Sequence, residues 1–251
     1  THLFSSAASD VYKRQQFDDV CIELVRSDKE DPQRNEEAFA RLRVVVKSRN
    51  KGLVGRLFNA KMIEIALANI PGFGPSNPIG DGASFLAYWP ALIDSSHITE
   101  YVHVDEEIIE VSPTSQQDLP AVVADFEPAR VSAAPTGDMA SIPFGRLFGT
   151  RSGDKGGCAN LGVWAKNDEA YGFLHTFLTI ERLKALLPDT AEFEIDRYEL
   201  ANVRSLNFFI KGILGEGVAS SVRTDPQAKT LGEYLRAKTI DVPAILAAQV
   251  K

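Results

Sequence analysis

The segment best suited to chemistry in this 251-residue chain is Arg151-Ser152-Gly153-Asp154-Lys155-Gly156-Gly157, with Asn160 close behind it. Its three glycines allow successive backbone N–H groups to turn toward one point, and Arg151 and Lys155 add positive charge. Such a loop can cradle a carboxylate or a phosphate. The alternative is a polar hairpin connection, because Gly-Asp and Gly-Gly are ordinary turn residues.

Two catalytic motifs nearly match this segment. A phosphate-binding P-loop needs glycine at position 154 and serine or threonine at position 156, where Asp154 and Gly156 stand. Ser152 and Lys155 have the S-x-x-K spacing of penicillin-recognising serine enzymes, but that pairing needs a helix, which the neighbouring glycines disfavour. Catalysis by Ser152 and Lys155 is kept as an alternative, with Asp154 as a candidate general base.

A second polar group lies further along the chain. Arg204 and Asn207 are three positions apart on a predicted strand, so their side chains face opposite sides unless a bulge intervenes. Both are retained as candidate ligand-binding residues. Four histidines without metal-ligand spacing and two cysteines provide no zinc site, so we expect no metal and no cofactor.

The composition narrows the class of protein. A hydrophobic content of 44% indicates a globular chain, and its length fits one or two domains. The net charge of −7 and the pI near 5.2 argue against nucleic acid and anionic membranes as partners. No apolar span or signal peptide is recognisable, so we expect a cytoplasmic protein.

The N-terminal part resembles the end of an α/β domain. Residues 1–15 are excluded as a non-native leader, and residues 16–110 form the remnant of the domain. Apolar patterning predicts two strands, an amphipathic helix and a closing strand, over residues 17–25, 42–47, 51–69 and 98–104. A long loop rich in Gly, Pro and aromatic residues, including Tyr88 and Trp89, precedes the last strand.

Residues 111–140 contain four prolines among small residues and predict a linker. Residues 141–251 then predict the order ββαββα, a compact α+β domain. The expected strands cover residues 142–150, 160–166, 193–200 and 204–214. The expected helices cover 168–187, as one or two helices with Asp168 as cap, and 226–238, with Asp225 as cap.

Two longer stretches carry a family resemblance: GTRSGDKGGCANLGVWAK, and RYELANVRSLNFFIKGILGEGVASSVRTDPQAKTLGEYLR. They resemble the C-terminal domain of the acyclic terpene utilisation (AtuA) family, and FNAKMIEIALANIPGF resembles the end of its larger N-terminal domain. The resemblance implies a ferredoxin-like C-terminal domain in a fragment of a longer protein. It also implies a bacterial catabolic role in growth on citronellol and geraniol, which proceeds through acyl-CoA thioesters.

Three hypotheses follow. The first is a protein of acyclic terpenoid or branched acyl-CoA degradation that binds or acts on an anionic acyl substrate through Arg151 to Gly157. The second is a non-catalytic assembly module that docks partner enzymes through an exposed sheet edge. The third is a serine hydrolase. In each case an open sheet and an aromatic loop predict a homo-oligomer.

Overall fold

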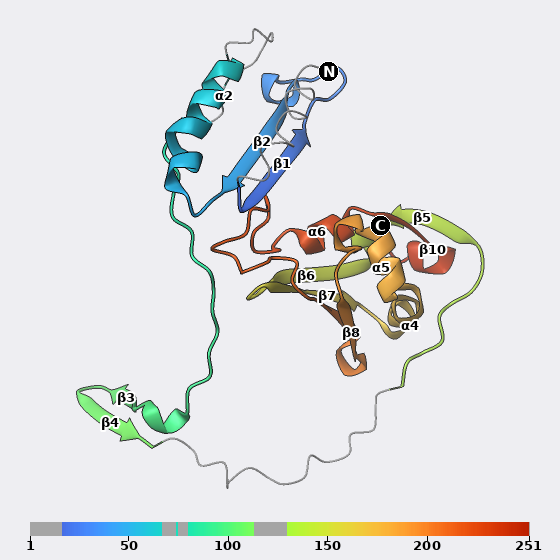
Figure 1. Ribbon diagram of the computed structural model, residues 1–251. Coiled ribbons are helices and arrows are strands. Elements are labelled where there is room, and N and C mark those ends of the chain that lie inside the picture. Colours follow the sequence, from blue (N-terminus) through green and yellow to red (C-terminus); the bar gives the residue numbers. More distant parts are fainter. Residues whose placement is uncertain (1–16, 67–73, 75–79, 113–129, 251) are drawn as a thin grey trace. The chain divides into compact units, whose positions relative to one another are not determined.

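The computed structural model describes residues 17–66, 74, 80–112 and 130–250. The chain divides into two compact units, one formed by residues up to 87 together with 217–227, the other by residues 88–216 and 228–251. Figure 1 shows their helices and strands, labelled where there is room. The expected leader and most of the expected linker lie outside the described residues.

The first unit contains a hairpin in which β1 (Asp19–Arg26) pairs antiparallel with β2 (Ala40–Lys47). A short 3-10 turn, η2 (Asn35–Glu37), lies in the connection. Side chains alternate between the faces of a strand, so one face of the hairpin pairs Val20 with Val46, Ile22 with Val44 and Leu24 with Leu42. The other face carries charge, with Glu23 opposite Arg43. Both strands expected in this region are confirmed.

A helix follows the hairpin in two parts, η3 (Leu53–Leu57) and α2 (Phe58–Ala66). The three- and four-residue spacing of apolar residues predicts this helix, and the structure confirms it as far as Ala66. Gly55 interrupts the helix, because its backbone angles of φ −98° and ψ −119° lie outside the helical region. The ring of Phe58 packs edge-on against Phe17, with 6.3 Å between the ring centroids.

The strand expected to close the N-terminal sheet is instead half of a separate hairpin. After a 3-10 turn, η4 (Ser95–His97), β3 (Glu100–Val104) pairs with β4 (Glu107–Val111) in a two-stranded sheet. Asp105 adopts a positive φ of 54° in the turn between them. The expectation that this strand extends the first sheet is therefore wrong, because its pairing partner follows it directly in the chain.

The second unit is built on a four-stranded antiparallel sheet with the order β6-β7-β9-β8. Its strands are β6 (Phe148–Lys155), β7 (Cys158–Ala165), β8 (Ile195–Leu200) and β9 (Ser205–Ile210). A two-stranded sheet pairs β5 (Met139–Pro143) with β10 (Thr239–Pro243). With the helices between them, these strands contain the expected ββαββα order and confirm the α+β class.

The helices cover one face of the four-stranded sheet. The longer ones are α4 (Asp168–Phe177), α5 (Ile180–Leu186) and α6 (Leu231–Arg236). Phe148 of β6 stacks on Phe173 of α4, and α6 packs on the same face of β6. Short helical turns complete the unit: α3 (Phe144–Leu147), η6 (Pro188–Thr190), η7 (Ala201–Val203) and α7 (Ala244–Ala247).

The core lies between this face and the helices. Burial along β7 alternates strictly, with Leu161 and Val163 fully buried and Asn160 and Gly162 half-buried. The same alternation in β9 buries Leu206, Phe208 and Ile210. Apolar residues from both strands therefore meet the helices, and the residues between them point to the opposite face.

Three details differ from the sequence expectations. The strand expected over 142–150 is divided by α3, so that β5 joins β10 and β6 begins at Phe148. The last helix starts at Leu231 instead of residue 226, because Ala228 has a positive φ of 51° that breaks a helix. The cap of α4 is Asn167, whose side chain accepts a hydrogen bond from the Ala170 N–H.

Candidate functional site

The Arg151–Gly157 segment is the end of a hairpin and not a loop. Strand β6 continues through Lys155, and β7 resumes at Cys158. Gly153 pairs with Asn160 inside the sheet, so its N–H group cannot turn toward a common point with those of Gly156 and Gly157. Of the three glycines only Gly156 has a positive φ, at 62°. The expected backbone cradle is therefore corrected: side chains, and not a glycine loop, must form any site here.

Strand alternation separates the polar residues of this segment. Ser152 and Asp154 are on the helix-covered side, whereas Arg151 and Lys155 belong to the opposite side. The Ser152 hydroxyl accepts a hydrogen bond from the Gly232 N–H at 2.9 Å, at the start of α6. Ser152 therefore anchors a helix, and the geometry does not bring it together with Lys155 as a nucleophile and base.

The face turned away from the helices gathers residues from all four strands, and we call it the open face. Arg151, Gly162, Asn207 and Tyr198 form one row across the sheet, in register. Asn160 lies two positions from Gly162, and its Nδ2 donates to Asn207 Oδ1 at 3.2 Å. The structure therefore brings together three of the predicted ligand-binding side chains, from three different strands.

This amide pair has hydrogen-bonding capacity left. An asparagine side chain offers one oxygen acceptor and two N–H donors. After the bond from Asn160 to Asn207, the pair still presents the oxygen of Asn160 and the NH₂ group of Asn207. The two groups can thus donate to and accept from one ligand edge.

Aromatic side chains border the amides. Trp164 is 41% exposed and Tyr198 is 52% exposed, and Phe209 lies half-buried beside Asn160 in the register. The Trp164 indole lies across Gly149, where a Cβ atom would be 2.2 Å from the ring. A side chain at position 149 would therefore displace the indole.

Lys229 adds a further positive charge to the edge of the open face. A Cβ atom at Gly153 would lie 3.5 Å from the Lys229 Nζ. The sequence analysis missed this residue, because Lys229 precedes α6 and only the packing of α6 on β6 places it beside Gly153. Arg151 and Lys229 together make the β6 side of the open face cationic.

Arg204 does not belong to the open face. It follows η7 in a left-handed conformation with φ 53°, and β9 begins only at Ser205. Its Nε lies 2.5 Å from Asp168 Oδ1 in an exposed ion pair. The expectation that Arg204 and Asn207 lie on opposite sides of one strand is wrong, because Arg204 is in the turn before the strand.

The predicted aromatic loop contributes one ring to this unit. Tyr88 N–H donates to the Glu216 carbonyl at 3.1 Å, and the Tyr88 ring lies beside Gly156, 3.5 Å from where a Cβ would stand. Trp89 is 88% exposed. The contact of Tyr88 with Gly156 places an aromatic residue at the hairpin end.

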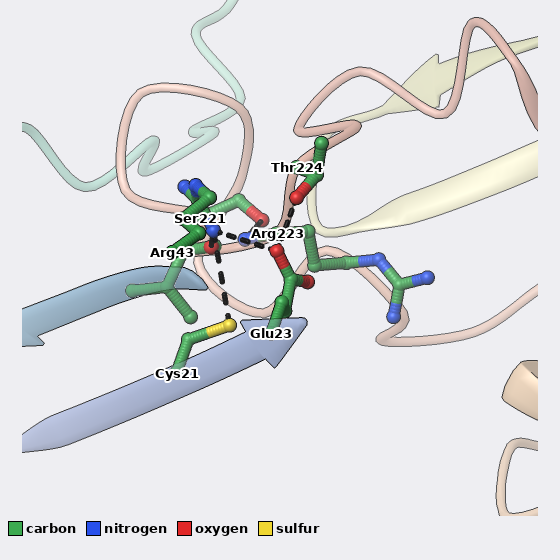
Figure 2. A network of polar contacts seen from close by, with 7 residues as sticks. Cys21, Glu23, Arg43, Ser221, Arg223 and Thr224 are labelled. Atoms are coloured by element: carbon green, nitrogen blue, oxygen red, sulfur yellow. Dashed lines mark hydrogen bonds and ion pairs between the residues drawn. The ribbon is translucent and has the colours of Figure 1, made fainter. Parts of the chain in front are cut away.

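A further polar cluster lies in the first unit and was not predicted. Figure 2 shows Arg43, Glu23 and Thr224 converging above β1 and β2. Arg43 Nη1 donates to Glu23 at 3.0 Å and to the Val222 carbonyl at 2.7 Å, and Thr224 Oγ1 donates to the same carboxylate. The hydrogen bond from Thr224, together with Arg43, lowers the pKa of Glu23. These contacts attach residues 217–227 to the hairpin.

Cys21 lies in this cluster without the properties of a reactive thiol. Its Sγ is 3.8 Å from Arg43 Nη1. Burial and the neighbouring Glu23 carboxylate raise the pKa of Cys21, which disfavours the nucleophilic thiolate.

The clustered charges between α4 and β8 are structural. Arg197 donates to the carbonyls of His175 and Leu178 at the C-terminal end of α4, at 2.8 and 3.2 Å. The His175 Nε2 lies 2.9 Å from Glu199, and this neighbour lowers the pKa of the Glu199 carboxyl. Burial, followed by the charge of Glu199, raises the pKa of Tyr171. The group holds the helix end to the sheet.

Within the described ranges, no cluster of three or more histidine, cysteine or acidic residues is arranged to hold a metal ion. The same part of the chain contains no helix that is both long and apolar enough to cross a membrane.

Comparison with known proteins identifies the family. A search of curated proteins and of solved structures gives no match. Residues 3–104 match the model of acyclic terpene utilisation family protein AtuA, and this match begins inside the segment excluded as a leader. Residues 142–241 match the AtuA ferredoxin-like domain, the unit that carries the open face. The chain therefore belongs to the AtuA family.

Proposed function

We propose that this protein acts in the cytoplasmic breakdown of acyclic terpenoids and branched acyl-CoA thioesters, and that its open face binds an anionic acyl substrate. Membership of the AtuA family implies a role in acyclic terpene utilisation. The observation that carries the proposal is the placement of Arg151 beside Gly162 and the Asn160–Asn207 amide pair. A guanidinium group next to unused amide groups suits a ligand with a negative charge and polar atoms.

The charge distribution also favours binding of the negatively charged end of the ligand at the open face. The chain as a whole carries a net charge of −7, yet Arg151 and Lys229 flank Gly153 at the edge of the open face. A local cationic edge on an acidic protein favours a small anion over a polyanion, because the rest of the surface repels a long charged chain.

Calorimetric titration of the full chain with branched-chain acyl-CoA thioesters and with free terpenoid acids tests the proposal. Arg151→Ala removes a charge-assisted contact worth about 1.5–3 kcal/mol, so the affinity falls roughly ten- to a hundredfold. Lys155→Ala has a smaller effect, because its Nζ is directed to the Asp154 carbonyl at 3.0 Å. Arg182→Ala, on the helix side, is the control for loss of one charge. Equal affinities for the parent and Arg151→Ala would overturn the proposal.

The hairpin β3–β4 favours a second function, assembly. All residues of both strands are exposed, among them the apolar Val102 and Ile109, which face each other across the hairpin. Exposed apolar strands of this kind suit contact with another chain and the expected homo-oligomer. Light scattering on the full chain, compared with Val102→Lys, would detect this contact, and a monomer in both samples would exclude it.

A further inference from the structure

Gly162 leaves a flat area without a side chain at the centre of the open face, and we call this area the floor. In the strand register its neighbours are Arg151 and Asn207 on the adjacent strands and Trp164 and Asn160 along β7. A Cβ atom at this glycine would meet only the Arg151 carbonyl at 3.6 Å and Asn207 Oδ1 at 4.0 Å, which are ordinary contacts. A cation, an indole and two amides therefore surround a position that has no side chain.

The chemistry around this floor selects for a planar polar ring. An alkyl chain placed here would bury the remaining amide groups of Asn160 and Asn207 without partners, which is unfavourable. A ring with an adjacent donor and acceptor satisfies both, with its donor to the Asn160 oxygen and its acceptor to the Asn207 NH₂ group. A single asparagine amide can bind adenine through one acceptor and one donor, and here the acceptor comes from Asn160 and the donor from Asn207. The exposed Trp164 adds an aromatic surface beside the ring.

We propose that the open face binds an adenine nucleotide, with adenine over Gly162 and its phosphate toward Arg151 and Lys229. This inference rests on the proposed function, because it takes the open face as the substrate site. The inference places the adenosine-phosphate end of an acyl-CoA thioester on the open face and the acyl end outside this face.

The order of hydrogen-bond donor and acceptor on the edge of the ring distinguishes adenine from guanine. Adenine presents an N–H₂ donor beside a ring-nitrogen acceptor, which matches the oxygen of Asn160 and the NH₂ group of Asn207. Guanine presents an oxygen acceptor beside an N–H donor, so it can meet both amides only with its ring turned over, which directs its phosphate away from Arg151 and Lys229. The arrangement thus predicts that adenine nucleotides bind better than guanine nucleotides.

Calorimetry with the full chain and two probes, adenosine 5′-diphosphate and guanosine 5′-diphosphate, tests the proposal. Gly162→Val fills the floor with a side chain whose Cβ meets the backbone only at an ordinary contact distance. It should retain the fold and lower adenosine diphosphate affinity by about tenfold or more. Ser141→Val, at an exposed position of β5, is the matched control and should bind as the parent does. Gly162→Ala provides the same comparison with a smaller group if the valine variant does not fold.

A second variant tests the hydrogen-bonding pattern of the Asn160–Asn207 amide pair. Asn207→Asp keeps the acceptor for Asn160 but removes the donor, so it should weaken adenosine diphosphate binding by about tenfold and reduce or reverse the preference over guanosine diphosphate. Unchanged affinity in both Gly162→Val and Asn207→Asp would overturn the adenine assignment.

Free terpenoid acids separate the two proposals. If these acids bind through Arg151 while adenosine diphosphate does not bind, the adenine inference fails and the proposed function stands. If neither class of ligand binds, both fail. If adenosine diphosphate binds and Gly162→Val weakens this binding, the adenine inference is supported whatever acyl group the substrate carries.

Discussion

The Asn160 Nδ2 donates to Asn207 Oδ1 at 3.2 Å, joining two side chains that are 47 positions apart in the chain and lie on neighbouring strands. Neither β7 nor β9 needs this bond for pairing, since the backbone ladder already joins them. On a face that the described helices α4 and α6 leave uncovered, the bond fixes two amides beside Arg151.

The close approach of Trp164 to Gly149 predicts different results for two glycines of the open face. Gly149→Ala should lower the free energy of unfolding by about 1–3 kcal/mol, because the new methyl group overlaps the indole. Gly162→Ala should change it by less than about 1 kcal/mol, because its methyl group meets only ordinary contacts. Urea unfolding of both variants measures the difference. Equal losses would show that Trp164 does not lie on Gly149.

Ser152 is expected to matter for stability alone. Ser152→Ala removes the acceptor for the Gly232 N–H and should lower the free energy of unfolding by about 0.5–2 kcal/mol. Ligand affinity should not change. A stable Ser152→Ala protein that loses a measurable hydrolytic activity would instead restore the serine-hydrolase hypothesis.

Glu23 should make the attachment of residues 217–227 dependent on pH. The hydrogen bond from Thr224 and the neighbouring Arg43 lower its pKa in the folded protein. A lowered pKa contributes stability that is complete above the unfolded-state value and is lost as the pH falls through the folded-state value. The protection of residues 217–227 against hydrogen exchange, relative to the intrinsic exchange rate at each pH, should therefore be high at neutral pH and fall only below the ordinary range of a glutamate carboxyl.

Glu23→Gln is the matching variant, because glutamine keeps the shape and removes the charge. It should lower the free energy of unfolding by about 0.5–1.5 kcal/mol at neutral pH and remove the acid-dependent step in exchange. An identical acid response in this variant would show that another group controls the segment.

Arg204 lies outside the open face, so its substitution should affect ligand affinity differently from the substitution of Arg151. Its ion pair with Asp168 is exposed on both sides, so Arg204→Ala should change the free energy of unfolding by less than about 1 kcal/mol and leave ligand affinity unchanged. A loss of affinity equal to that of Arg151→Ala would place Arg204 in the site.

The sequence predicts the helices and strands of the second unit better than it predicts which face of the sheet each side chain occupies. Alternation of apolar residues in β7 and the spacing of apolar residues in α4 and α5 are local patterns, and they indicate the ββαββα order correctly. The glycines between Arg151 and Gly157 favour a turn by composition, yet pairing with β7 extends the strand through Gly153. Strand pairing of this kind is a tertiary effect that no local pattern contains.

The candidate site is predictable only in part for the same reason. Arg151, Asn160 and Asn207 are recognisable as polar residues in unusual positions, but the register that places them in adjacent rows depends on the whole sheet. The sequence pattern predicts a strand from Arg204 onward, because nothing local marks the left-handed turn at this residue. Lys229 carries no signal at all, since only the packing of α6 brings it to Gly153.

The most direct test of the central claim uses Trp164 as a probe of the open face. The chain contains two tryptophans, so Trp89→Phe leaves Trp164 as the sole one. Titration of this protein with a branched-chain acyl-CoA thioester should change the Trp164 emission in a saturable way, and adding Arg151→Ala should raise the midpoint roughly tenfold or more. Saturable binding by calorimetry without any change in Trp164 emission, or an unchanged midpoint in Arg151→Ala, would contradict binding on the open face.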